Sequence, residues 1–227
     1  MVKPDLTEAF YSACALLEKS FFVDARYCDY AGLKATASLE NGTVRARVSR
    51  GFENAPREVL LGLALYLLSK MFCCRVDARL VKPYKEFSRG KSAAELSKAL
   101  RRARGRSRRN SAKGKNYDLE VMLDELWPAW EGIEKPSVEW SRRKSRRKLG
   151  WFDDAFNKIV LNRALDERAP RFVVEYVLFH ELLHAKHDVI YGRGKSLRRA
   201  VHTQGFRRDE EGFVHAREAE EWLRCNW

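Results

Sequence analysis

The stretch His180-Glu181-Leu182-Leu183-His184 is the part of this 227-residue sequence that decides its fold. An α-helix rises about 1.5 Å and turns about 100° per residue, so histidines four positions apart lie on one face, about 6 Å apart along the axis. Both imidazoles can therefore bind one metal ion, with the carboxylate of Glu181 beside the open side of that ion. The pattern predicts a zinc site on a helix.

The residues before this pattern predict that its helix is buried. A helix is expected from Pro170, since proline is favoured at the first helical position, to about residue 187. Valine, leucine and alanine side chains form a wide apolar stripe along it. The alternative is a core helix whose histidines only pack, but such a helix rarely directs two histidines and a glutamate to one side without a ligand. Three short strands are expected at residues 137–140, 149–152 and 158–162.

A catalytic zinc ion needs a third protein ligand and leaves its fourth position to water. His187 lies too far along a continuous helix, about 10 Å from His180, to share the metal. His202 is the favoured third ligand, because the glycine-containing segment 192–196 lets the chain turn back towards the helix. The sequence leaves three other candidates open, which are Glu210, Glu218 and His215.

Several short motifs between residues 118 and 227 occur together in one known family. They are Trp140-Ser141, the basic stretch into Leu149-Gly150, the strand residues 159–161 with Leu165-Asp166, the helix of residues 176–184, and His202 followed by Phe206. In this combination the sequence resembles the SprT-like (Spartan-type) zinc metalloproteases and the related YgjP-like metallopeptidases. The resemblance implies a zincin-like fold in which His180, His184 and His202 bind zinc and Glu181 is the catalytic base.

The activity that this resemblance implies is that of an endopeptidase acting on proteins at or near DNA. Zinc would activate a water molecule, whose proton Glu181 takes and later passes to the leaving amine. The strand at residues 159–162, placed at a sheet edge, would hold an extended peptide by main-chain pairing. Two features depart from the family. The glycine that usually follows the third histidine is displaced to Gly205, and no cysteine-rich zinc module follows, since only Cys225 lies downstream.

The charge of the sequence predicts an acidic partner. Its formal net charge is +13 and its pI is about 9.7, and nucleic acid is the commonest partner of such proteins. The excess falls in two runs, from which we expect phosphate contacts and binding to DNA without sequence preference. A solvated linker or hairpin is the alternative for each run. The first run contains Lys98, Arg101, Arg102, Arg104, Arg106, Arg108, Arg109, Lys113 and Lys115, and the second contains Arg142, Arg143, Lys144, Arg146, Arg147 and Lys148.

Cysteine usage and hydropathy predict a cytoplasmic protein without a membrane partner. The chain has five cysteines, an odd number without any Cys-x-x-Cys, which argues against a disulfide framework and a zinc knuckle. Its first residues lack the apolar segment of a signal peptide. The longest apolar run, residues 59–68, is too short to span a bilayer.

Two parts of the chain share one order of predicted elements. An aspartate, a strand and an Ala-Pro-Arg helix start occur at Asp5, 43–48 and 55–57, and again at Asp118, 158–161 and 169–171, at an offset of 113 to 114 residues. This order predicts a duplication whose first copy has lost the metal site. The alternative is a chance similarity of two ordinary strand-to-helix units. Aligned on Ala-Pro-Arg, the residues in the places of His180, Glu181 and His184 are Tyr66, Leu67 and Lys70.

These observations combine into a predicted α+β protein with three parts. Residues 1–90 form a non-catalytic domain, a degenerate repeat of similar build. Residues 91–117 form a basic helix, with a capping box at 92–95, and a flexible linker. Residues 118–227 form a zincin-like metalloprotease domain, with a small antiparallel sheet packed on the His-Glu-x-x-His helix.

The favoured function is a zinc-dependent endopeptidase that cleaves proteins at or near DNA. One alternative is a nucleic-acid-binding module with a structural zinc site, and another is a metallopeptidase of small substrates whose basic runs are incidental. Glu181 separates the first two, because a structural site does not need a carboxylate directed at an open position of the metal.

Overall fold

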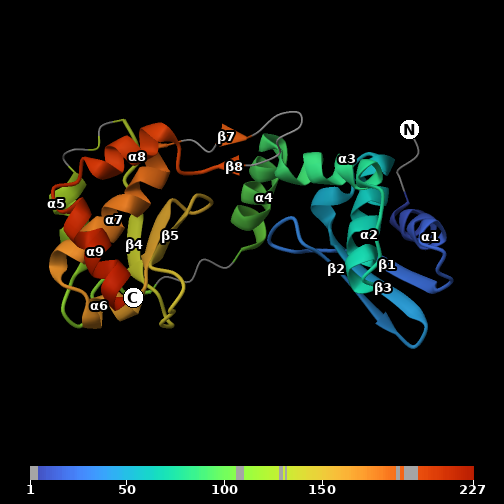
Figure 1. Cartoon of the computed structure of the whole chain (residues 1–227), viewed down its shortest axis with the longest axis horizontal. Coiled ribbons are helices and arrows are strands. Elements are labelled where there is room, and N and C mark those ends of the chain that lie inside the picture. Colours follow the sequence, from blue (N-terminus) through green and yellow to red (C-terminus); the bar gives the residue numbers. More distant parts are fainter. Residues whose placement is uncertain (1–4, 106–109, 128–129, 131, 188–189, 192–198) are drawn as a thin grey trace. The chain divides into compact units, whose positions relative to one another are not determined.

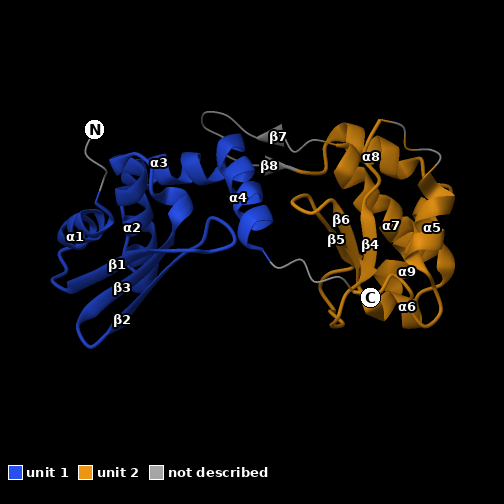
Figure 2. Cartoon of the chain, turned by 180° about the vertical axis from the view of Figure 1, so that it is seen from behind, with its two compact units in different colours: residues 1–106, 191–198 blue, residues 107–190, 199–227 orange. Residues whose placement is uncertain are grey.

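The computed structural model describes residues 5–105, 110–127, 130, 132–187, 190–191 and 199–227. The chain is an α+β protein of helices and small sheets (Figure 1). It divides into two compact units (Figure 2), of which unit 1 contains residues 1–106 and 191–198, and unit 2 contains residues 107–190 and 199–227. None of the described helices is long and apolar enough to cross a membrane.

Unit 1 has a three-stranded sheet with a core between the sheet and two helices. Val44, Ala46 and Val48 alternate along the central strand and are fully buried, because successive side chains of a strand point to opposite faces. The first helix begins after Asp5, whose carboxylate accepts a hydrogen bond from the backbone N–H of Thr7. The elements are α1 (Leu6–Leu16), β1 (Phe22–Cys28), β2 (Ala35–Glu40), β3 (Thr43–Ser49), the 3-10 helix η1 (Arg50–Phe52), α2 (Arg57–Met71), α3 (Ala78–Arg89) and α4 (Lys91–Arg104).

Unit 2 has a second sheet and a separate core. Trp140 and Ile159 of the sheet, and Leu178 and Leu182 of the long helix α7, are fully buried in it. The elements described after α4 are α5 (Leu119–Leu126), β4 (Ser137–Trp140), β5 (Gly150–Asp153), β6 (Lys158–Leu161), α6 (Arg163–Arg168), α7 (Arg171–Lys186), β7 (Ile190–Tyr191), β8 (Arg199–Ala200), α8 (Gln204–Glu211) and α9 (Ala216–Asn226). The two-residue strands β7 and β8 pair with each other.

The sheet of unit 2 differs from the prediction in strand direction and order. The order is β4-β6-β5, with β4 parallel and β5 antiparallel to β6, so the sheet is mixed and the predicted antiparallel sheet is wrong. Strand β6 is central and paired on both sides, so it is not the edge strand predicted at residues 159–162. All four of its residues are buried, as is usual for a central strand. The two edge strands of this sheet are β4 and β5.

The two units share their strand order and directions. The order in unit 1 is β1-β3-β2, with β1 parallel and β2 antiparallel to β3. In the parallel pairs, Phe22 lies opposite Thr43 in unit 1 and Ser137 lies opposite Lys158 in unit 2. The two paired residues are therefore separated by the same number of sequence positions in both units. The pairs Phe22/Ser137 and Thr43/Lys158 are each offset by 115 residues, slightly more than predicted. A shared order is what the predicted duplication requires, and common descent stays a prediction.

The predicted connector at residues 91–117 is shared between the two units. Helix α4 begins after Gly90 without a side-chain cap, so the predicted capping box at 92–95 is wrong, although the helix ends before Gly105 as expected. Residues 110–117 belong to unit 2 and are tightly held. The carboxylate of the buried Asp166 accepts hydrogen bonds from the backbone N–H groups of Lys115, Asn116 and Tyr117. This part of the connector is therefore not a flexible linker.

Candidate metal centre

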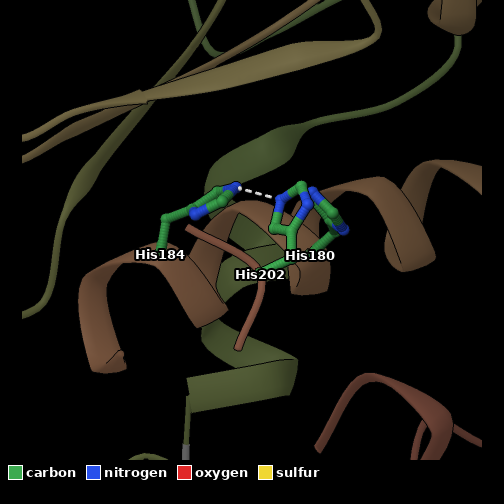
Figure 3. A group of neighbouring side chains, drawn as sticks. All are labelled: His180, His184 and His202. Carbon is green, nitrogen blue, oxygen red and sulfur yellow. Dashed lines mark hydrogen bonds between the residues drawn. The ribbon is translucent and has the colours of Figure 1, made fainter. Parts of the chain in front are cut away.

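Helix α7 carries the first two histidines of the centre. The helix begins after Pro170, which is its N-cap rather than its first helical residue, and ends at Lys186. Its buried side packs on β5 and β6. His180 and His184 are half-buried one turn apart, with ring centroids separated by 5.1 Å. The predicted helix therefore directs both imidazoles into one place, as Figure 3 shows.

His202 is the third histidine of the group and comes from a segment outside α7. It precedes α8, whose N-cap Thr203 accepts a hydrogen bond from the N–H of Phe206. Phe206 is fully buried, and its ring centroid lies 5.2 Å from that of His180, 4.9 Å from that of His184 and 4.7 Å from that of His202. The ring of Phe206 therefore packs against the imidazoles of all three histidines. The displaced Gly205 does not prevent this arrangement.

The nitrogen atoms of the three histidines fit a single zinc ion. Ligand atoms of His180, His184 and His202 all lie within 4.8 Å of one another. His202 Nε2 is 3.3 Å from His184 Nε2 (Figure 3). Zinc binds imidazole nitrogen at about 2.0–2.1 Å, so two nitrogens of a tetrahedral site are about 3.4 Å apart. The donor set and spacing therefore suit zinc, with room for a fourth ligand.

The other candidates for the third ligand lie outside this group. His187 Nε2 is 2.8 Å from a carboxylate oxygen of Asp209, and His215 packs its ring against Phe172 with centroids 5.9 Å apart. Glu218 is exposed on α9. Glu210 lies close to the centre and contacts His180 at Nδ1, but it is not part of the group of converging ligand atoms. Among the described residues, His202 is thus the candidate whose ligand atoms converge with those of both His180 and His184.

Glu210 holds the ring of His180 in place. Its Oε1 atom is 2.5 Å from His180 Nδ1, and it also accepts a hydrogen bond from the hydroxyl group of Tyr176. With Nδ1 donating to this carboxylate, Nε2 of His180 keeps its lone pair for a metal. Burial is the largest single effect and lowers the pKa of His180, but the hydrogen bond to Glu210 and the nearby charges of Glu181 and Glu210 together outweigh it and place the pKa above its usual value. The sequence did not identify this role, because it depends on the packing of α8 against α7.

Glu181 is a buried carboxylic acid beside the three imidazoles. It is 5% exposed, and burial raises its pKa to about 7 against the opposing effects of His180, Lys148 and a backbone hydrogen bond from Phe152. Its Oε2 atom lies 4.0 Å from His184 Nε2. The glutamate therefore exchanges a proton near neutral pH, which is the property that a general acid–base group needs.

The histidines that face each other are neutral at the same pH. Burial, together with the nearby His180 and His202, lowers the pKa of His184 to about 4. Burial also lowers the pKa of His202. A neutral imidazole keeps the lone pair that binds a metal ion, so the electrostatics of the centre favour cation binding.

Strand β5 passes directly over Glu181. A Cβ atom on Gly150, the first residue of β5, would lie 3.1 Å from Glu181 Oε1 and 2.7 Å from Leu161 Cδ2. Only glycine therefore lets the strand come this close. The sequence marked Gly150 as part of a family motif, and the structure gives a steric reason for it.

The two predicted basic runs are divided between the units, because Lys98 to Arg104 lie in unit 1, whereas Lys113, Lys115 and the whole second run lie in unit 2. In the first run, Arg101, Arg102 and Arg104 lie on α4 of unit 1, where Arg104 pairs with Asp29 at 3.1 Å. Arg106, Arg108 and Arg109 fall outside the described residues. The six cationic residues of the second run are all exposed, on the loop between β4 and β5 of unit 2. This loop, together with Lys113 and Lys115, is the described part of the basic runs that belongs to the same unit as the histidines.

The fold and the site define an α+β protein with a three-histidine centre and a buried glutamate beside it. No protein-family profile matches the sequence, and a search of curated proteins gave no match. Among solved structures, the chain is similar to the crystal structure of the metallopeptidase zymogen of Methanocaldococcus jannaschii jannalysin. The sequence identity is 18%, the TM-score is 0.35, and the match covers 48% of this chain and 92% of that chain. A likeness of this size does not define the function of the chain.

Proposed function

We propose that this protein is a zinc-dependent endopeptidase of the SprT-like kind, which hydrolyses proteins at or near DNA. The observation that carries the proposal is the convergence of His180, His184 and His202 beside Glu181, a buried carboxyl group whose pKa is raised to about 7. These four residues are the ones that the sequence and its family resemblance predict as zinc ligands and catalytic base. A zinc ion held by the three histidines supplies a Lewis acid that polarises a carbonyl group and acidifies water.

The residues of the chain account for the proton transfers of peptide hydrolysis. Glu181 takes a proton from the attacking water and passes it to the nitrogen of the leaving amine. Its raised pKa keeps the two protonation states close in free energy near neutral pH. Glu210 and Tyr176 do not touch substrate in this scheme; they position the ring of His180.

The edge strand supports a peptide rather than a small molecule as substrate. Strand β5 pairs with β6 on one side. An extended peptide that adds to its other edge would run past Glu181, next to Gly150. Main-chain pairing of this kind accepts many sequences, as an endopeptidase of broad specificity requires.

A structural zinc site in a nucleic-acid-binding module is the second candidate. Structural sites are closed by four protein ligands, whereas the described residues of this group offer three. A buried glutamate with a raised pKa is also costly for stability and has no purpose in a closed site. These two observations favour catalysis.

The test combines metal analysis with two variants of the full chain. The wild type should bind one zinc ion and cleave an unfolded protein substrate. Glu181→Gln should keep its zinc and lose at least about 100-fold of the cleavage rate, because the general base is removed. His202→Ala should lose zinc, whereas His215→Ala, with its ring outside the centre, should keep it. A folded wild-type protein that binds no zinc would refute the proposal.

A further inference from the structure

The basic loop between β4 and β5 is held in a fixed shape. Asn162, which is 1% exposed, donates side-chain hydrogen bonds to the carbonyl groups of Ser145 (2.6 Å) and Lys148 (2.7 Å). Its backbone N–H donates to the carbonyl group of Leu149 at 2.7 Å. Near the other end of the loop, the hydroxyl group of Ser141 donates to the carbonyl group of Arg143 at 2.8 Å. The loop therefore presents its cations from an ordered backbone.

This loop forms one wall of a pocket in unit 2. The pocket has a volume of about 370 Å³. Among the residues that line the pocket, Arg168 is the last residue of α6 and lies outside the basic run in the sequence. The fold alone brings this residue to the loop. The pocket is lined by Lys144, Ser145, Arg146, Ala164, Arg168, Asn226 and Trp227.

The charge in and around the pocket is positive. Lys144 pairs with Glu167 at 2.6 Å, and this carboxylate also interacts with Arg168. Within the described part of the chain, no acidic side chain forms an ion pair with Arg142, Arg143, Arg146 or Arg147. One carboxylate thus stands against a larger group of guanidinium and ammonium groups. An anion would gain charge-assisted hydrogen bonds there, and arginine can form two such bonds to one phosphate.

We propose that this pocket binds a backbone phosphate of a nucleic acid, with Arg146 and Arg168 as its ligands. The inference deepens the nucleic-acid part of the proposed function. A free phosphate compound would use the same chemistry, but the cations continue beyond the pocket at Arg142, Arg143 and Arg147, which are exposed. A chain of phosphates, rather than one anion, matches this continuation.

The basic loop connects the pocket with the strand that lies against Glu181. Lys148, at the end of the loop, is two residues from Gly150, a separation of at most about 7 Å along the chain. Gly150 in turn lies against Glu181. A protein bound to the same nucleic acid would therefore be presented beside β5.

Binding of a fluorescent single-stranded oligothymidylate to the full chain tests the inference. Arg146→Ala and Arg168→Ala should each weaken binding several-fold at low salt. Each should also reduce the slope of log affinity against log salt by about 0.7, the value for one lost contact with single-stranded nucleic acid. The matched control is Arg217→Ala, an exposed arginine at the start of α9, away from the lining residues, and it should change neither quantity.

The outcomes separate this inference from the proposed function. If the wild type binds the oligonucleotide and Arg168→Ala behaves like Arg217→Ala, the pocket is overturned while nucleic-acid binding by the exposed run stands. If Arg168→Ala abolishes binding of inorganic phosphate but leaves the oligonucleotide affinity unchanged, the pocket serves a small phosphate compound and the inference is also wrong. Zinc content and proteolysis, measured on the same wild-type protein, decide the protease activity independently.

Discussion

At the scale of single residues, the three-histidine centre includes a carboxylate that contacts His180 at Nδ1. Glu210 fixes the orientation and tautomer of His180 through Nδ1, and Tyr176 fixes Glu210. Such partners of ligating histidines commonly contribute 10- to 100-fold in metal affinity, at about the level of one hydrogen bond to a charged group. The free energy of metal binding is therefore spread over more residues than the three ligands.

Glu210→Gln should lower zinc affinity by about 10- to 100-fold, because the amide keeps the shape of the side chain but not its charge. Competition with a chromogenic chelator measures this. Glu211→Gln, on the exposed neighbour, is the control and should bind zinc as the wild type does. Equal affinities of the Glu210 and Glu211 variants would mean that Glu210 does not support His180.

Glu181 should make the metal-free protein less stable as the pH rises. The folded-state pKa of about 7 lies above the unfolded value near 4.5, so the folded state holds more protons between these values. The contribution of Glu181 to the free energy of unfolding is then highest at low pH, and it falls by up to about 3 kcal/mol as the pH rises through this window.

Glu181→Gln removes this penalty. Denaturant titrations in the presence of chelator should find the variant more stable than the wild type at pH 8, with the difference disappearing towards pH 4.5. A difference that does not depend on pH would show that the carboxyl group is not protonated in the folded protein near neutral pH.

At the scale of elements, the close approach of β5 to α7 brings main-chain groups to Glu181. This approach requires glycine at the start of the strand, where any Cβ atom would contact both Glu181 and the β6 residue Leu161. A strand displaced to accommodate a side chain would move the peptide-binding edge and Glu181 apart.

Gly150→Ala should therefore reduce cleavage more strongly than zinc binding. The added methyl group displaces β5 or Glu181 but touches none of the three histidines. Turnover of an unfolded protein, compared with zinc affinity, checks the expectation. Gly205→Ala is the control near the centre, since its methyl group would have no contact shorter than 3.5 Å. Unimpaired cleavage by Gly150→Ala would argue against a substrate path along β5.

The sequence was informative about elements with local signals and uninformative about contacts between distant ones. Helix α7 and the strands of unit 2 follow from apolar patterning, and His202 follows from ligand chemistry. The pairing of β4 with β6 was missed because parallel neighbours are set by tertiary packing, and β6 was wrongly placed at an edge although its apolar run suits a central strand. Glu210 and Asn162 were missed because their roles depend on partners 30 and 17 residues away.

At the scale of the whole molecule, the two units have the same strand order, but the three-histidine centre lies in unit 2. In unit 1, Lys70 and Tyr66 lie one helical turn apart on α2, and Lys70 Nζ is 2.6 Å from the hydroxyl oxygen of Tyr66. Lys70 is exposed, so its ammonium group stays in contact with solvent. The described residues of unit 1 contain no cluster that could hold a metal, and each unit has its own core.

Zinc should therefore stabilise unit 2 alone. Hydrogen exchange measured with and without zinc should show added protection of amides in α7 and α8 and unchanged exchange in α2, because the ligand binds only the folded form of one core. The α2 amides act as an internal control within the same molecule. Equal protection of α2 and α7 would indicate a second metal site or strong coupling of the units.

In the proposed zinc site, the position of His202 would make the ion a cross-link between two segments of the chain. His184 and His202 are 18 positions apart in the sequence, and an ion bound to both closes that stretch of chain into a ring. By the chain-entropy estimate used for disulfides, a ring of this size restricts the unfolded state by about 3 kcal/mol. A cut in the backbone between the two histidines would then leave the pieces joined through the ion and the contact of α7 with α8.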